Sequence, residues 1–283
     1  MGKLGAMLRL ARIDHGVMAA IATLVGYALG AQGWSNVQLL PAFIAVAITL
    51  AVEIGLFVFN DIYNLEEDKI NAPWRPLVRG DIGVKEAWII GLASLTLGTV
   101  LSLILGVVPA LLVIVAVASG MAYNVKLKRA GLPGNVIVAF DTALPFLFGA
   151  SIPSGFRIPR IAILLTSIAF LATLGREVLK GIVDMEGDRR VGVRTLAIVK
   201  GPAFAARVAS LLMMAAVAAS LLAIPLLPEG KLPLYASTVA LTNALFIYAS
   251  FSLLLQKSAA AARGRKLTLL AMLTGILAFA TTA

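Results

Sequence analysis

Residues 37–63, VQLLPAFIAVAITLAVEIGLFVFNDIY, decide the fold class of this chain. The run contains one charged residue, Glu53, before it reaches the polar pair Asn60-Asp61. A helix needs about 20 predominantly apolar residues to cross the hydrocarbon core of a bilayer. The stretch therefore predicts a transmembrane helix with a polar end at one membrane surface.

Eight further apolar segments of similar length accompany this one. The chain has 283 residues, of which 60% are hydrophobic and 13% charged, with mean hydropathy +0.96, whereas soluble domains are about half apolar and a quarter charged. The first segment follows several basic residues, as a signal peptide would, but because eight more spans come after it we interpret it as the first helix. The predicted fold is all-α, a single membrane domain over residues 1–283 with nine transmembrane helices around a central cavity. The predicted spans are residues 14–33, 37–63, 84–105, 107–124, 133–152, 158–180, 202–226, 233–255 and 265–282.

Basic residues lie almost entirely on one side of this predicted topology. The net charge is +10, and if the helices alternate in direction, all but three of the 24 Lys and Arg residues fall on the side of the N-terminus. The exceptions are Arg157, Arg160 and Lys231. Cytoplasmic loops carry the excess of Lys and Arg in membrane proteins. We therefore expect a multi-pass protein of the cell membrane with a cytoplasmic N-terminus, and its basic character indicates topology and not a nucleic-acid partner.

Two long polar loops, residues 61–83 and 181–201, lie on the predicted cytoplasmic side and resemble each other. At an offset of 120 residues, the polar positions of 60–68 align with those of 180–188. This similarity predicts a pseudo-repeat of about four helices, with the functional site between the two halves and the loops as its cap. The chain contains no cysteine, which excludes disulfides and thiol catalysis.

The first polar cluster occupies residues 60–68. Asn60, Asn64 and Asp68 are four residues apart, so their side chains share one helical face or line one loop. Asp61 adds a further carboxylate to the cluster. Mg²⁺ prefers hard oxygen ligands of this kind and takes a few carboxylates together with waters and substrate phosphates.

The second cluster combines cations with carboxylates. Arg176, Lys180, Asp184 and Asp188 recur every four residues and form one stripe, with the cations deeper in the predicted span. A metal diphosphate requires carboxylates beside fixed cations, which neutralise the remaining phosphate charge. Departure of diphosphate from an allylic carbon builds negative charge on oxygen, which metal and cations stabilise.

Two other interpretations of these clusters remain open. The second stripe is also compatible with internal ion pairs such as Lys180 with Asp184, worth only tenths of a kcal/mol, but such pairs do not explain why the stripe begins inside a membrane span. A secondary transporter with charges between repeats is the alternative of another class. Transporter sites lie near the bilayer centre, whereas these clusters lie at predicted helix exits.

These motifs resemble the two aspartate-rich signatures of the UbiA superfamily of intramembrane prenyltransferases. The resemblance rests on 60–68 followed by Arg75-Pro76-Leu77-x-x-Gly80, on 176–188, on Tyr123-Asn124-x-Lys126 and on Arg12-x-Asp14, and it covers essentially the whole chain. Two positions depart from the family pattern, because Asn64 replaces a usual aspartate and Gly181 a common acidic residue. These departures leave open which carboxylates bind metal directly.

The resemblance implies a Mg²⁺-dependent transferase that acts on an isoprenoid diphosphate in the lipid bilayer. Residues 174–196 are most similar to the archaeal digeranylgeranylglyceryl phosphate synthases, which transfer a geranylgeranyl group from its diphosphate to the hydroxyl of geranylgeranylglyceryl phosphate. The rival within the family is an aromatic, 4-hydroxybenzoate-type polyprenyltransferase, so the acceptor is either a lipid phosphate or an aromatic acid. The expected metal ligands are Asp61, Asn64, Asp68, Asp184 and Asp188, of which Asp68, Asp184 and Asp188 are the expected catalytic residues, and the expected substrate-binding residues are Asn60, Arg75, Lys126, Arg176, Lys180 and Arg12.

Two acids inside predicted spans have no assigned role. Glu53 lies on the face of its segment that carries Asn60, and either extends a polar cavity or is a buried structural residue. Asp141 either orients a cation or the acceptor hydroxyl, or forms a structural pair. The general base is unassigned, with Asp68 or a neighbouring acid as a first hypothesis.

Overall fold

The chain folds entirely into helices wherever its structure is described. The computed structural model describes residues 3–10, 12–190, 192–255 and 260–283, and within these ranges every regular element is a helix. This confirms the all-α prediction. The nine long helices of the described residues are α2 (Ile13–Gly30), α3 (Leu39–Tyr63), α6 (Val84–Ser102), α7 (Val107–Val125), α8 (Leu132–Ser154), α9 (Arg160–Val183), α12 (Pro202–Leu221), α13 (Leu232–Leu254) and α14 (Ala260–Ala280).

The prediction of nine membrane spans is confirmed only in part. In the described part of the chain, seven segments are long and apolar enough to cross a membrane, and they correspond to α3, α6, α7, α8, α9, α12 and α13. The apolar stretch of α2 runs from His15 to Gly30 and is shorter than these seven segments. Helix α14 carries Arg263, Arg265 and Lys266 in its first two turns, so its uncharged apolar part is short. The protein is an integral membrane protein, and the exact number of crossings stays a prediction.

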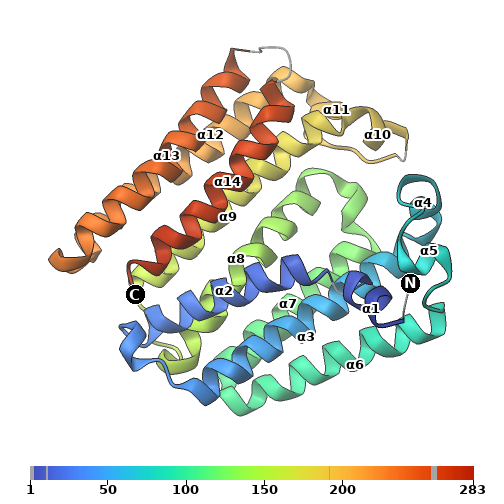
Figure 1. Ribbon diagram of the computed structural model, residues 1–283. Coiled ribbons are helices and arrows are strands. Elements are labelled where there is room, and N and C mark those ends of the chain that lie inside the picture. The colour runs from blue at the N-terminus through green and yellow to red at the C-terminus, as the bar shows by residue number, and fades with distance from the viewer. Residues whose placement is uncertain (1–2, 11, 191, 256–259) are drawn as a thin grey trace.

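The long helices form a closed arrangement. Helices α3, α6, α7, α8, α9, α12, α13 and α14 contact one another in that order, and α2 closes the ring by contacting both α14 and α3. Figure 1 shows α9, α12, α13 and α14 grouped on one side, with α2, α3, α6, α7 and α8 on the other. Helices α8 and α9 join the two groups. A ring of this kind leaves room at its centre for a substrate.

Close backbone contact between α2 and α8 holds the ring on the side away from the cap. A Cβ atom on Gly26 would lie 2.0 Å from the carbonyl oxygen of Phe146, and one on Gly30 would lie 2.2 Å from that of Ala150. On α8, a Cβ atom on Gly149 would lie 2.0 Å from the carbonyl oxygen of Thr23. Small residues let membrane helices approach in this way, and van der Waals packing then stabilises the pair.

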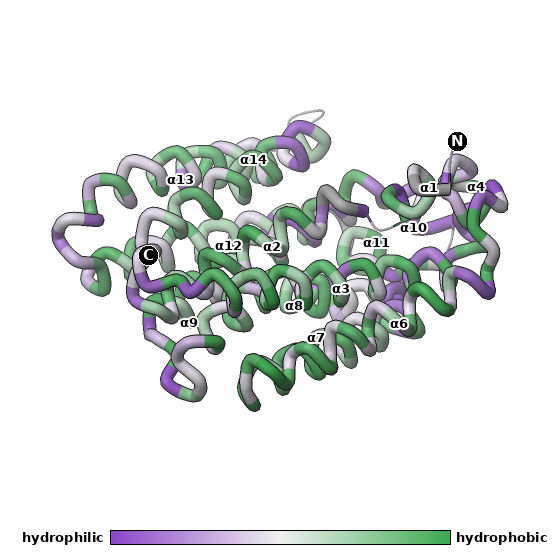
Figure 2. The backbone as a smooth tube through the Cα atoms, turned by 60° about the horizontal axis from the view of Figure 1, so that its bottom comes forward, coloured by the Kyte–Doolittle hydropathy of each residue, from purple (hydrophilic) through white to green (hydrophobic). Residues whose placement is uncertain are grey.

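Five short helices gather at one end of the bundle, which we call the cap end. They are α1 (Lys3–Leu10), α4 (Leu65–Asn71), α5 (Pro76–Arg79), α10 (Met185–Arg190) and α11 (Leu196–Lys200), and Figure 1 shows them at the same end. Figure 2 shows hydrophilic residues concentrated there and hydrophobic residues along the long helices. The predicted cap loops 61–83 and 181–201 thus each contain a pair of short helices.

The order of elements follows the predicted repeat. The series α2, α3, α4, α5, α6, α7 is matched by α8, α9, α10, α11, α12, α13, with α4 and α10 starting at Leu65 and Met185 and α5 and α11 at Pro76 and Leu196. Each series therefore has two long helices, two short ones and two long ones. Superposition of the two halves stays a prediction.

Candidate active site

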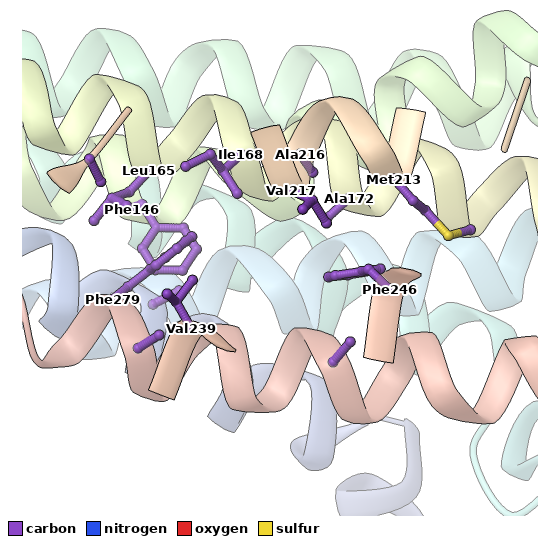
Figure 3. Close-up of a cluster of buried hydrophobic side chains, with 14 of the residues drawn as sticks. Phe146, Leu165, Ile168, Ala172, Met213, Ala216, Val217, Val239, Phe246 and Phe279 are labelled. Carbon is purple, nitrogen blue, oxygen red and sulfur yellow. The ribbon is translucent and has the colours of Figure 1, made fainter. Parts of the chain in front are cut away.

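A cavity of about 520 Å³ lies between the two groups of long helices and opens toward both cap motifs. This volume is in the range of about 300–1,000 Å³ found for small-molecule sites. Apolar side chains line much of its deep part, among them Phe146 of α8, Val239 and Phe246 of α13 and Phe279 of α14. Figure 3 shows these four side chains between the helices. The rings of Phe146 and Phe279 meet at a centroid distance of 5.5 Å, nearly edge to face.

The first motif forms one wall of the polar end. Asn60, Asn64 and Asp68 line the cavity, as their spacing predicts. Helix α3 ends at Tyr63 and α4 begins at Leu65, so the motif bridges a helix exit and the following short helix. Asn60 Nδ2 donates to Asn124 Oδ1 at 2.8 Å, and Asn124 Nδ2 donates to the carbonyl oxygen of Leu56 at 2.9 Å. Asn124 thereby fixes the orientation of the Asn60 amide.

Two arginines surround Asp61 behind this wall. Arg12 Nη2 donates to Asp61 Oδ1 at 2.7 Å, and Arg75 Nη1 donates to the same oxygen at 2.9 Å. Arg75 also pairs with Asp68 Oδ2. Arg12 and Arg75 line the cavity, whereas Asp61 is buried and is not among the lining residues. The contacts give Asp61 an orienting role toward both arginines, and direct metal binding by Asp61 stays a prediction.

The structure turns Lys128, and not the predicted Lys126, toward the cavity. Lys128 lines the cavity, and its Nζ donates to Asn64 Oδ1 at 2.6 Å and pairs with Glu67 Oε2 at 3.1 Å. Lys126 is exposed and does not line the cavity. The difference arises because α7 ends at Val125 and the next residues form the turn η3 (Leu127–Ala130), which rotates the basic run. Its sequence KLKR gave no signal for which lysine faces inward.

Contact with the second cap loop, residues 181–201, helps to position η3. A Cβ atom on Gly131 would lie 1.9 Å from the carbonyl oxygen of Arg194, and Gly131 has φ +73°, so only glycine fits without strain. The amide of Arg194 donates to the carbonyl oxygen of Arg129 at 3.3 Å. The loop of the first half that carries Lys128 is thereby held against the cap of the second half.

The second motif forms the facing wall through α9. Arg176, Glu177 and Lys180 line the cavity. Lys180 Nζ lies 2.9 Å from both Glu177 carboxylate oxygens, and Arg176 Nη1 lies 3.4 Å from Glu177 Oε1. Arg176 Nε is buried and makes no hydrogen bond. Glu177 lies inside the second motif but is not part of its four-residue spacing, and in the structure it is the acid that contacts both cations.

The two acids that end the second motif lie beyond the cavity wall. Asp184 and Asp188 are not among the residues that line it. Asp184 Oδ1 accepts from Arg265 Nη1 of α14 at 3.0 Å, a partner that no sequence pattern indicated because it lies 81 residues away. Burial and the charge of Asp184 raise the pKa of Asp188, whereas Lys180 and Lys128 lower it.

Lysine 128 links the two motifs electrostatically. Burial raises the pKa of Asp68, the charge of Asp61 raises it further, and Arg75 and Lys128 act in the opposite direction. The charge of Lys128 thus lowers the pKa of both Asp68, from the first motif, and Asp188, from the second. Residues of both motifs also line one cavity, so the two motifs lie at the same end of the molecule.

The donor set fits a magnesium ion that arrives with a diphosphate. Among the described residues there is no group of three or more His, Cys, Asp or Glu side chains that could hold a metal ion. Mg²⁺ commonly takes one or two carboxylates and completes its shell with water and substrate phosphates. Asn60, Asn64 and Asp68 on one wall carry oxygens of the kind that such a shell requires, Asn64 and Asp68 now pair with Lys128 and Arg75, and metal binding at these residues stays a prediction.

The ion pairs of Glu67 with Lys128 and Arg129 can be tested by the pH dependence of stability. Burial raises the pKa of Glu67, but hydrogen bonds from Arg129 and Lys128 outweigh it and lower the pKa below its ordinary value. A lowered pKa in the folded state stabilises the protein above the unfolded value of about 4.3, and this contribution is lost as pH falls through the folded pKa. Glu67→Gln is therefore expected to lower Tm at pH 7 by about 1–4 °C, as for one partly exposed ion pair.

Thermal unfolding in detergent at several pH values measures this effect. The difference in Tm between the wild type and Glu67→Gln is expected to shrink as the pH falls below 4.3. Glu66→Gln, which removes an exposed carboxylate that pairs with Lys69, is the matched control. An equal difference in Tm for Glu67→Gln at every pH would contradict the assignment.

Comparison with known proteins identifies close relatives. Residues 19–279 match the UbiA prenyltransferase family. A digeranylgeranylglyceryl phosphate synthase of Archaeoglobus fulgidus is 36% identical over 98% of this chain and 94% of its own length. The synthase of Ignicoccus hospitalis is 39% identical over 81% of this chain and 75% of its own length.

Solved structures show the same fold. A structure concerning digeranylgeranylglyceryl phosphate synthase in membranes has a TM-score of 0.84 and 30% identity, covering 100% of this chain and 99% of its own. A UbiA homologue from Archaeoglobus fulgidus, bound to GPP and Mg²⁺, has a TM-score of 0.69 at 19% identity, covering 97% of this chain and 99% of its own.

Proposed function

The chain belongs to the UbiA prenyltransferase family and is a prenyltransferase, and on this premise we propose that it transfers a geranylgeranyl group from its diphosphate to geranylgeranylglyceryl phosphate. The relatives that match it over most of their length are digeranylgeranylglyceryl phosphate synthases. The observation that carries the proposal is a single cavity with residues of both motifs at its polar end and an apolar interior. The bond formed is the ether bond between the lipid hydroxyl and C1 of the donor.

The residues of the polar end would bind the donor diphosphate. Arg176, Lys180 and Lys128 line the cavity and would donate charge-assisted hydrogen bonds to phosphate oxygens. Arg176 Nε, buried and without a partner, is available for such a bond. These fixed cations stabilise the negative charge that develops on the leaving diphosphate.

A magnesium ion completes this charge balance. The residues that would hold it are Asn64 and Asp68, with Asp188 and Asp184 supplying further carboxylates from the second cap. Mg²⁺, when bound, neutralises charge on the diphosphate and so favours its departure. A UbiA homologue binds GPP together with Mg²⁺, which supports this choice of metal.

The apolar interior would hold prenyl chains and exclude water. Phe146, Val239, Phe246 and Phe279 surround it. Exclusion of water prevents the hydrolysis of a reactive allylic centre. We place the cap in the cytoplasm of the cell because the basic residues gather on that side of the predicted topology.

A product assay tests the proposed function. Purified protein is incubated with geranylgeranyl diphosphate and either geranylgeranylglyceryl phosphate or 4-hydroxybenzoate, and the products are identified by mass spectrometry. The expected result is the lipid ether in the presence of Mg²⁺, no prenylated 4-hydroxybenzoate, and loss of activity with EDTA that added Mg²⁺ reverses. Prenylation of 4-hydroxybenzoate alone would select the aromatic alternative, and flux of substrate in liposomes without turnover would select a transporter.

A further inference from the structure

Four acidic residues line the cavity in the described part of the chain, and only two of them are held by cations. Asp68 pairs with Arg75, and Glu177 pairs with Lys180 and Arg176. Carboxylates whose oxygens already accept from cations are poorly suited to take a proton. The other two, Glu53 of α3 and Asp141 of α8, form no ion pair with any described residue.

Glu53 and Asp141 share one place in the cavity wall. Both also line a smaller cavity of about 50 Å³ between α3, α7 and α8. Asp141 Oδ1 accepts from Ser119 Oγ of α7 at 2.6 Å. Glu53 forms no hydrogen bond with another described residue, so its oxygens are available to a ligand. An acid inside a membrane span is costly to keep, and its presence at a cavity indicates a function.

Glu53 lies one helical turn deeper than a fixed cation. The guanidinium carbon of Arg12 lies 4.7 Å from the centroid of the Phe57 ring, and Phe57 follows Glu53 by four residues, about one turn of 5.4 Å on α3. Arg12 lines the cavity and is anchored on Asp61. A glycerol phosphate separates its phosphate from its free hydroxyl by two carbons, so a phosphate at Arg12 would bring that hydroxyl toward Glu53.

We infer that Glu53 is the general base that accepts the proton of the attacking hydroxyl. The inference rests on the proposed function and adds a residue to it. The hydroxyl oxygen forms a bond to C1 of the donor, the bond between C1 and the diphosphate oxygen breaks with its electron pair leaving on the diphosphate, and the hydroxyl proton passes to a carboxylate oxygen of Glu53. Asp141, held by Ser119, is a positioning residue beside it.

Replacement of Glu53 by glutamine tests this role. Glu53→Gln is expected to lower kcat by about 10²- to 10⁴-fold, the range for loss of a general base, with unchanged donor binding and unchanged Tm. Asp141→Asn is expected to cause a smaller loss. Glu229→Gln, the same change at an exposed residue outside the cavity, is the matched control. A wild-type kcat in Glu53→Gln would overturn the inference, as would a larger loss in Asp141→Asn or in His15→Gln, a third residue that lines the cavity.

A thiol analogue of the acceptor separates proton transfer from a structural effect. A thiol is far more acidic than an alcohol, with a pKa of about 8.5 for the cysteine side chain, and loses its proton without a strong base. The ratio of wild-type to Glu53→Gln turnover is therefore expected to fall strongly when the thiol replaces the hydroxyl. An equal ratio for both acceptors, or weaker donor binding together with a lower Tm, would show that Glu53 acts structurally. If the wild type itself forms no ether, the proposed function fails, which is a separate outcome.

Discussion

Asp68→Asn is expected to lower turnover at least ~100-fold, comparable to the loss of a major electrostatic contact in an active site. Asp68 lines the cavity at its polar end, and the charge of Lys128 acts on it as it does on Asp188 of the other half. Asparagine keeps the shape of the side chain but removes the negative charge needed to hold a metal beside the diphosphate. The protein is expected to remain folded, because Arg75 keeps its hydrogen bond to Asp61.

Steady-state turnover measured over a range of Mg²⁺ concentrations checks this result. Higher Mg²⁺ is expected to restore part of the lost activity, because the weakened site then fills by mass action. Glu66→Gln removes an exposed carboxylate two residues earlier on α4 and is the control for a change of charge at the cap. A wild-type rate and Mg²⁺ dependence in Asp68→Asn would remove this residue from the metal site.

Lys180→Met is expected to weaken donor binding about 10- to 100-fold, since a hydrogen bond to a charged group contributes about 1.5–3 kcal/mol. Lys180 lines the cavity opposite the first motif, and its only ion-pair partner among the described residues is Glu177. Methionine keeps the length of the side chain and removes the charge that would meet a phosphate. Among the described residues, Glu177 then keeps Arg176 as its one cationic partner. The less neutralised charge of Glu177 further weakens the binding of the donor diphosphate.

Isothermal titration with the donor and with the acceptor measures the two affinities separately. The donor Kd is expected to rise more than the acceptor Kd. Lys200→Met makes the same substitution at an exposed residue at the end of α11, and both affinities are expected to remain those of the wild type. An equal loss for donor and acceptor in Lys180→Met would assign this lysine to general cap electrostatics and not to the donor diphosphate.

Most of the fold could be predicted from local sequence, with two instructive limits. The spans of α3 and α9 and the ends of these helices at Asn64 and Asp184 were expected within a few residues, because the length of an apolar run is a local property. Helices α2 and α14 fell short as spans because α2 has a short apolar stretch and α14 carries three basic residues in its first two turns. The short helices within the cap loops were expected only as loops, since segments of four to seven residues carry little periodic signal.

The structure brings some of the predicted site residues to one cavity and leaves others outside it, and their roles stay predictions. Asn60, Asn64, Asp68, Arg12, Arg75, Arg176 and Lys180 all line one cavity. Asp61, Lys126, Asp184 and Asp188 do not line it. The spacing of four places side chains on one face while the helix continues, but it does not tell how the chain turns once the helix has ended.

The sequence by itself determined that this is a helical membrane protein with two matched polar motifs at helix exits. It could do so because backbone groups in hydrocarbon must be satisfied within each segment, so an apolar run of sufficient length has to be a helix. Only the tertiary structure decided that Arg12 meets Asp61, that Lys128 replaces Lys126, that Arg265 reaches Asp184, and that Glu53 and Asp141 share a wall. These contacts join residues far apart in the chain, and they depend on how each helix is rotated and packed against its neighbours.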